Sequence, residues 1–161
     1  MNPFATFGMA LFAGLVVGSL VEYWVHRLMH AGILFARSHA GHHANDSAKG
    51  VIPEGLDYLI SAALVTPLGF LHSTAAGTGF LVGCVAYAFF SAYGHQLQHD
   101  NPAACFWMRS MPVHAVHHRD AMNDANFGLA LPIWDHVFGT YRRVPWERPP
   151  DRGGPLAVRF R

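Results

Sequence analysis

The chain has 161 residues, a length that suits one domain, and a formal net charge of +1 at pH 7. Charged residues make up 13% of it and hydrophobic residues 52%, so its charged share is about half that of an ordinary soluble domain. This balance favours a membrane protein and argues against a nucleic-acid-binding protein, because phosphate neutralisation needs a basic surface. We therefore expect no nucleic acid partner.

The first predicted element is an apolar run from Phe4 to Val25 that carries a single charge, Glu22. A helix of about 20 apolar residues is long enough to cross a bilayer. A cleaved signal peptide would need Lys or Arg ahead of the apolar run, and none stands there. The run therefore predicts a transmembrane helix that the protein retains.

Two further apolar runs, Tyr58–Leu71 and Gly79–Gly94, are separated by the uncharged stretch "HSTAAGTG", which is typical of a tight turn. Together they predict a transmembrane hairpin. The first of the two contains Pro67 and reaches only about 21 Å as a helix, less than the hydrocarbon core of about 30 Å. We expect either that flanking residues extend this helix or that the bilayer thins around it.

The eleven Lys and Arg residues fall in three zones, 27–49, 109–143 and 148–161, all outside the predicted spans. With three spans, every positive charge lies on one side of the membrane, which the positive-inside rule identifies as cytoplasmic. We expect the N-terminus and the hairpin tip on the outer side. Residues 1–144 are predicted to form one membrane-embedded catalytic domain, and the Pro-, Gly- and Arg-rich residues 145–161 a flexible tail.

Twelve histidines are the unusual feature of the composition. The two cysteines, Cys84 and Cys105, form no C-x-x-C pair and are expected to be free, buried thiols. Ten histidines form two repeats of one theme, an H-x3-H followed by an H-x2-HH. They are His26, His30, His39, His42, His43, His95, His99, His114, His117 and His118.

The spacing of these histidines is that of metal ligands on helices. Residues four apart share one helix face, so each H-x3-H presents two imidazoles together where a span leaves the membrane. In H-x2-HH the adjacent pair diverges by about 100°, so its two rings can serve different ions. Ten nitrogens exceed the needs of one ion and suit two ions with about five each. We predict all ten to be metal ligands on the cytoplasmic side.

All-imidazole ligation suits Zn, Cu, Fe or Ni rather than Mg or Ca. A zinc metalloprotease would need Glu after the first histidine of H-x3-H, where this chain has Arg27 and Gln96. A bis-histidine haem would need histidines within the spans, and a metal transporter would need polar groups at mid-membrane, which we do not find in the apolar runs. Scattered histidines could also sense pH. His72 and His136, outside the pattern, are expected to be core or interface residues.

With these motifs the chain resembles the fatty acid hydroxylase/sterol desaturase superfamily. The resemblance is carried by "EYWVHRLMH" (22–30), "HAGHH" (39–43), "HQLQH" (95–99), "HAVHH" (114–118) and "NFGLALPIWDHVFGTYRR" (126–143). It covers residues 20–143. The short length and paired histidine motifs also resemble the carotenoid β-ring hydroxylases, whereas "WDHVFGTY" favours the sterol desaturase and fatty acid hydroxylase branch.

The resemblance implies an all-α integral membrane enzyme with a cytosolic helical cap that holds two iron ions on the ten histidines. It implies O2 as co-substrate, a lipid substrate from the bilayer, and hydroxylation or desaturation of a C–H bond in lipid biosynthesis. Zinc can replace iron in such sites during overproduction. The chain carries no cytochrome-like, flavin or Fe–S motif, so a separate ferredoxin, cytochrome or reductase is expected to supply electrons. The compact length favours a bacterial inner membrane.

Acidic residues near the histidines are expected to accept hydrogen bonds from ligand N–H groups. The candidates are Glu22, Asp46, Asp100, Asp120 and Asp124. Trp134, Phe138 and Tyr141 are expected to dock the C-terminal segment against the cap rather than to touch substrate. Two alternatives stay open at this point: a membrane metal-binding or metal-transport protein without redox chemistry, and a zinc-dependent membrane hydrolase.

Overall fold

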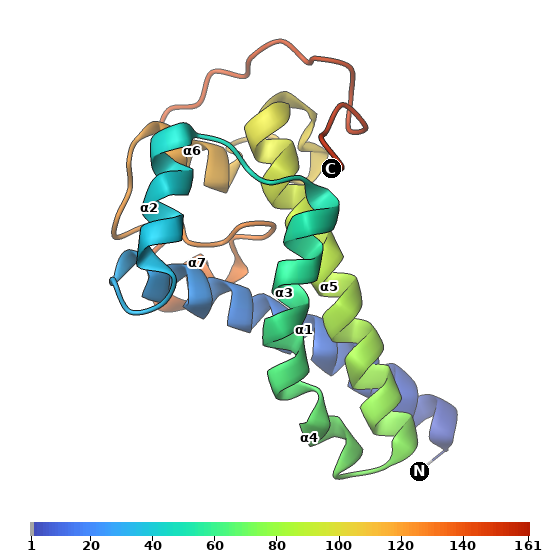
Figure 1. Ribbon diagram of the computed structural model, residues 1–161. Coiled ribbons are helices and arrows are strands. Elements are labelled where there is room, and N and C mark those ends of the chain that lie inside the picture. Colours follow the sequence, from blue (N-terminus) through green and yellow to red (C-terminus); the bar gives the residue numbers. More distant parts are fainter. Residues whose placement is uncertain (1) are drawn as a thin grey trace.

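The computed structural model describes residues 2–161, and every regular element in that range is a helix (Figure 1). The predicted all-α fold class is confirmed. The helices are α1 (Pro3–His30), α2 (Ala36–Asn45), α3 (Val51–Val65), α4 (Pro67–Phe70), α5 (Thr74–Asp100), α6 (Val113–Arg119) and α7 (Ile133–Phe138), with 3-10 turns η1 (Pro102–Ala104) and η2 (Phe106–Met108).

Three helical segments are long and apolar enough to cross a membrane: α1, the joined α3 and α4, and α5. This confirms the three predicted spans. The two longest begin with side-chain caps, because Asn2 accepts a hydrogen bond from the Phe4 amide and Ser73 accepts one from the Ala76 amide. Both α1 and α5 start at the end of the molecule where the N-terminus lies. Helix α3 runs in the direction opposite to α5 (Figure 1).

Flanking residues extend the second span, as the first of the two expectations for this short apolar run stated. Helix α3 begins at Val51, and with α4 the segment has 20 residues, enough for about 30 Å. Pro67 lacks an amide hydrogen and divides α3 from α4, while Thr66 before it keeps helical dihedral angles. The predicted turn is shorter than expected, because α5 begins at Thr74 and includes most of "HSTAAGTG". Gly77 and Gly79 in that stretch serve packing: the Phe70 ring and the Phe7 backbone lie against them.

Helices α1 and α5 pack directly against each other through small residues, which we call the glycine seam (Gly14, Gly79 and Gly83). A Cβ at Gly83 would overlap the carbonyl oxygen of Leu11, and one at Gly14 would overlap that of Phe80. Close approach of this kind is how helices associate in lipid, where burial of apolar surface supplies little driving force.

The cap lies at the far ends of α1 and α5 and contains α2, α6, α7 and the connecting loops, with α7 beside the second half of α1 (Figure 1). Its core includes Leu97, Met108, Val113 and Val116, with Trp146 packed against them. Cys84 and Cys105 are buried and unpaired, as predicted.

Residues 145–161 contain no helix but contact the rest of the chain. The Arg148 guanidinium donates to the Ala103 carbonyl, and the Val51 amide donates to the Arg159 carbonyl. The division of the chain at residue 144 and the flexibility of the tail stay predictions.

Candidate metal centre

All ten predicted histidines meet where α1 and α5 end. His26 and His30 are in the last turns of α1, and His95 and His99 in those of α5. The two H-x2-HH motifs lie on α2 and α6, which close over these helix ends. The predicted helical placement of the four motifs is therefore confirmed, and whether the histidines bind metal stays a prediction.

The imidazoles divide into two groups. The first group is His26, His30, His39, His43 and His117, whose facing nitrogens all lie within 4.8 Å of one another. His42, His95, His99 and His114 satisfy the same criterion, and His118 is joined to them through His99 and Asp46. The ring centroid of His118 is 4.5 to 4.6 Å from those of His42, His99 and His114. We call these five residues the second group.

Each adjacent histidine pair is divided between the groups. His43 belongs to the first group and His42 to the second, while His117 belongs to the first and His118 to the second. This follows from the divergence of neighbouring side chains on a helix. The arrangement offers five imidazoles to each of two positions, as the spacing predicted.

The first group is oriented by neutral oxygen atoms of the loop that follows α6. The Nδ1–H groups of His26 and His117 donate to the carbonyl oxygens of Phe127 and Ala125, at 2.6 and 2.9 Å. His30 Nδ1–H donates to the Asn123 side-chain oxygen at 3.3 Å. In a neutral ring this leaves Nε2 with a bare lone pair.

These bare nitrogens face one another. His30 Nε2 lies 2.9 Å from His117 Nε2 and 3.2 Å from His26 Nε2. Lone pairs that point at each other repel, so the contacts are not hydrogen bonds between neutral rings. Two nitrogens bound to one ion at about 2.1 Å are about 3 Å apart, which fits the observed separations.

The second group is oriented mainly by carboxylates. His95 Nδ1–H donates to Glu54 at 2.5 Å, and the Nδ1 atoms of His99 and His118 lie 3.2 and 3.3 Å from one Asp46 oxygen. His42 Nδ1–H donates to the Ser47 carbonyl. His118 Nε2 is buried without a hydrogen-bond partner, as expected of a nitrogen that serves as a ligand.

The imidazoles outside the spans are held neutral. Burial, reinforced by repulsion from neighbouring imidazoles, lowers the pKa of His39 to about 3 and that of His43 to about 4. Burial also lowers the pKa of His117 to about 3. Neutral imidazole is the form that binds a metal, so at neutral pH the rings are ready as ligands. The donor set therefore fits two transition-metal ions.

The loop from Asn123 to Leu131 is fixed from both sides. The Leu129 amide donates to Glu22 on α1, and Gln98 on α5 donates to the Leu129 carbonyl. The buried Asp135 accepts from the Phe127 and Gly128 amides at 2.8 and 2.7 Å. These bonds set the direction of the Phe127 carbonyl, and through it the orientation of the His26 ring.

Residues of the "WDHVFGTY" motif make docking contacts, but Trp134 and Phe138 dock against α1 rather than against the cap as predicted, and only Tyr141 contacts the cap core. Trp134 Nε1–H donates to the Ser19 hydroxyl, and the Phe138 ring stacks on Tyr23 with centroids 5.2 Å apart. Tyr141 packs against the cap core. The motif therefore fastens the C-terminal part of the cap to the first span.

Of the predicted acids, only Asp46 approaches ligand nitrogens, at ion-pair distance from the Nδ1 atoms of His99 and His118, and its role as a hydrogen-bond acceptor stays a prediction. Glu22 accepts from Tyr87 and Ser91, and Asp100 accepts from Gln96. Asp120 and Asp124 pair with arginines on the surface.

Sequence reasoning missed Glu54, which touches a histidine, and Asp135, which acts through the loop. An acid at the entrance of an apolar helix was the available signal for Glu54, but the predicted span began four residues after it, and Asp57 stands at the same entrance.

The two remaining histidines lie outside both groups. His72 is exposed at the turn between α4 and α5, where the sequence placed it. His136 is exposed on α7 and stacks on the Tyr141 ring with centroids 4.0 Å apart. A core position is therefore wrong for both, because each lies on a surface turn or an exposed helix face, and an interface position stays a prediction.

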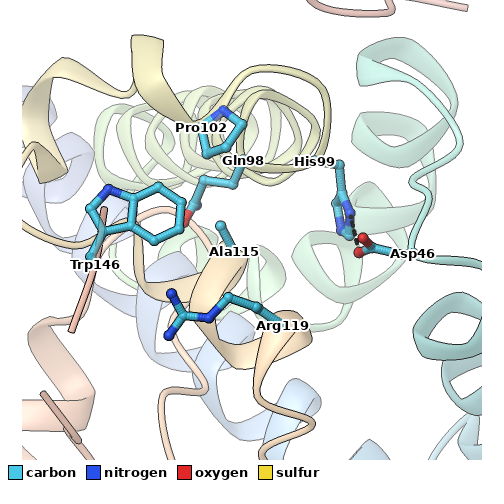
Figure 2. Close-up of a pocket in the computed structure, with 7 residues that line it drawn as sticks. All are labelled: Asp46, Gln98, His99, Pro102, Ala115, Arg119 and Trp146. Atoms are coloured by element: carbon cyan, nitrogen blue, oxygen red, sulfur yellow. Dashed lines mark ion pairs between the residues drawn. The ribbon is translucent and has the colours of Figure 1, made fainter. Parts of the chain in front are cut away.

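A pocket of about 200 Å³ opens in the cap beside the second group (Figure 2). It is lined by Asp46, Gln98, His99, Pro102, Ala115, Arg119 and Trp146. Figure 2 shows the Asp46 carboxylate turned toward the His99 ring. The pocket gives small polar molecules an approach to this side of the centre.

Comparison of the sequence with known proteins shows which family the chain belongs to. The sequence model of the family described as "fatty acid hydroxylase" matches residues 11–140. The very-long-chain aldehyde decarbonylase GL1-6 of Oryza sativa subsp. indica is 27% identical over 154 residues, covering 84% of this chain and 24% of the relative.

Two other relatives are similar in extent. The very-long-chain aldehyde decarbonylase GL1-1 of the same rice is 32% identical, over 83% of this chain and 25% of the relative. The very-long-chain aldehyde decarbonylase CER1 of Arabidopsis thaliana is 26% identical, over 81% and 23%. The chain thus spans about a quarter of the length of these relatives. No solved structure matches it.

Proposed function

The chain belongs to the fatty acid hydroxylase family, and on that premise we propose that it is a di-iron, O2-dependent enzyme that hydroxylates or desaturates a C–H bond of a membrane lipid. The observation that carries the proposal is the gathering of ten imidazoles into two groups of five, with bare Nε2 atoms facing one another. Two iron ions, when bound, would supply O2 activation and oxidation of the substrate. In hydroxylation, substrate, O2, two electrons and two protons give the alcohol and water; in desaturation they give the alkene and two waters.

The first and second groups would each hold one ion. The Phe127 and Ala125 carbonyls and the carboxylates of Glu54 and Asp46 keep the rings in the tautomer that presents Nε2. Imidazole ligation suits iron and also zinc, copper or nickel, so metal identity is part of the proposal.

The surroundings of the centre support an apolar substrate. The Phe138 ring stacks on Tyr23, and the Phe127 ring packs edge to face against Tyr23 and His26, so these aromatic rings restrict water on the α1 side. The three spans mark an integral membrane protein, so a lipid would reach the centre from the bilayer. We place the centre on the cytoplasmic side, because the Lys and Arg residues fall at the histidine-bearing ends of the spans or beyond them, and none precedes α1 or lies at the turn between α4 and α5.

Two electrons per turnover would come from a separate ferredoxin, cytochrome or reductase. A bacterial inner membrane is the setting we propose. The metal-transport alternative has less support, because α1 and α5 close against each other at the glycine seam and leave no polar path between them there.

The test is lipid mass spectrometry after aerobic expression in a host of defined lipid composition. Wild type should produce a fatty acid, sterol or carotenoid with one added oxygen atom or two fewer hydrogen atoms, and His117→Ala should not. His136→Ala is the matched control, because His136 is exposed and outside both groups, and it should keep the product. Identical lipids in wild type and His117→Ala would overturn the proposal.

A second candidate follows from the named activity of the relatives, which are aldehyde decarbonylases. The same cells should therefore also be fed long-chain aldehydes. Hydrocarbon one carbon shorter than the aldehyde, formed by wild type and not by His117→Ala, would favour this activity over hydroxylation.

A further inference from the structure

The two histidine groups are supported by different chemistry. In the first group the three hydrogen-bonded Nδ1 atoms face neutral oxygens, two from carbonyls and one from the Asn123 amide. In the second group three Nδ1 atoms face carboxylates, one on Glu54 and two on Asp46. All five rings on each side come from equivalent positions of the two motifs, so the difference lies in what surrounds them.

The nearby charges point the same way. Arg27 lies beside the first group: its guanidinium carbon is 5.8 Å from the centroid of the Phe127 ring, which packs on His26 and His30. The second group has two anions in direct contact with its ligands. A carboxylate partner makes an imidazole a stronger ligand and also offsets the charge of a bound cation.

Of the two acids, Glu54 is the more effective. Its residue is 5% exposed, and its carboxylate is held by the Lys49 amide at 2.8 Å and by the Tyr58 hydroxyl at 3.4 Å. The side chain of Asp46 is 75% exposed, so water and salt screen its charge. The fixed, desolvated charge of Glu54 therefore interacts more strongly with a neighbouring ion than the charge of Asp46 does.

We propose that the two metal positions are unequal: the second group binds its ion first and more tightly, and Glu54 is the positioning residue that sets the difference. This inference rests on the proposed two-metal site. It concerns metal affinity, so it can be tested without turnover or a known substrate.

The experiment is anaerobic titration of the full-length, metal-stripped protein in detergent with Co²⁺, followed by its visible absorption. Wild type should bind in two phases of one ion each, with affinities at least about tenfold apart, in line with the usual size of partner effects on metal ligands. His42→Ala and His43→Ala are a matched pair of neighbours that assign the phases. The first should remove the tight phase and the second the weak phase.

Glu54→Gln keeps the size of the side chain and removes its charge. It should weaken the tight phase by about 10- to 100-fold and shift its absorption bands, while the weak phase changes less than about twofold. Asp57→Asn, on the same helix but exposed and paired with Lys49, is the control and should titrate as wild type. A purely structural role for Glu54 would instead weaken both phases together.

The failures are distinguishable. If Glu54→Gln weakens both phases equally, or if His43→Ala removes the tight phase, the inequality we propose is wrong and the two-metal site stands. If wild type binds Co²⁺ at neither group, the proposed function falls with it.

Discussion

At the glycine seam α1 and α5 touch backbone to backbone, whereas at their histidine-bearing ends a loop is tied to both helices. The seam has no side chains to adjust, so a single methyl group added at Gly83 meets a carbonyl oxygen. The other end is held by hydrogen bonds from the Leu129 amide to Glu22 and from Gln98 to the Leu129 carbonyl. The same two helices are thus held by close backbone packing in the membrane and by hydrogen bonds at the metal centre. Substitutions at the seam should reduce the yield of folded protein, and substitutions at the centre should reduce metal content.

The largest effect is expected at the seam. Gly83→Leu forces α1 and α5 apart and should cost more than about 3 kcal/mol, because overpacking here meets backbone rather than a mobile side chain. We expect little folded protein by size-exclusion chromatography in detergent. Gly8→Leu, on the same helix pair with no atom near its added Cβ, should behave as wild type. Equal yields for both variants would show that the seam does not hold the helices.

At the centre, Asp135→Ala removes the acceptor for the Phe127 and Gly128 amides and should lower the free energy of unfolding by about 3 kcal/mol, since buried donors are left unpaired. The protein should still fold in the membrane but lose metal, because the Phe127 carbonyl no longer fixes His26. Metal analysis and thermal unfolding measure the two effects. Asp124→Ala, at an exposed pair with Arg142, is the control and should change neither. Full metal content in Asp135→Ala would contradict the role of the loop.

The two ends should also differ in their response to pH. His39, His43 and His117 have folded-state pKa values near 3 to 4, below the ordinary 6.5, so the unfolded chain binds more protons between these limits. The metal-free protein should therefore lose stability steadily as pH falls from 6.5 to 4, measured by thermal melts followed by circular dichroism. Gly18→Ala, a mild change against the Tyr87 side chain in the apolar half, should cost the same at every pH. A melting temperature independent of pH would contradict the burial of neutral imidazoles.

The smallest effect separates the surface acids. Asp46→Ala removes the carboxylate that lies 3.2 and 3.3 Å from the Nδ1 atoms of His99 and His118 and should lower metal content modestly, because the carboxylate is exposed. Asp120→Ala breaks only a surface pair with Arg119 and should leave metal content unchanged. Inductively coupled plasma mass spectrometry of the two purified variants makes the comparison. The same loss in both would place Asp46 outside the centre.

The sequence was sufficient for the features that depend on local periodicity. The H-x3-H and H-x2-HH spacings predicted helices that gather ten imidazoles, and the apolar runs predicted three spans. The supports of the centre were not predictable in the same way. The Ala125 and Phe127 carbonyls are backbone atoms, which every residue has, so no residue type marks them. Glu54 contacts His95 only because α3 packs beside α5. Most of "HSTAAGTG" is helical rather than a turn, and its glycines let Phe70 and Phe7 pack closely against the helix.

Both α1 and α5 run without interruption from the seam to the histidines. Gly14 and His26 are thus rigidly joined about 18 Å apart along one helix. Pivoting at the seam by about 3° would displace the imidazoles by about 1 Å, as much as separates a ligand from a non-ligand. Because helices change tilt to match the thickness of their membrane, the thickness of the surrounding bilayer should affect the positions of the imidazoles at the centre.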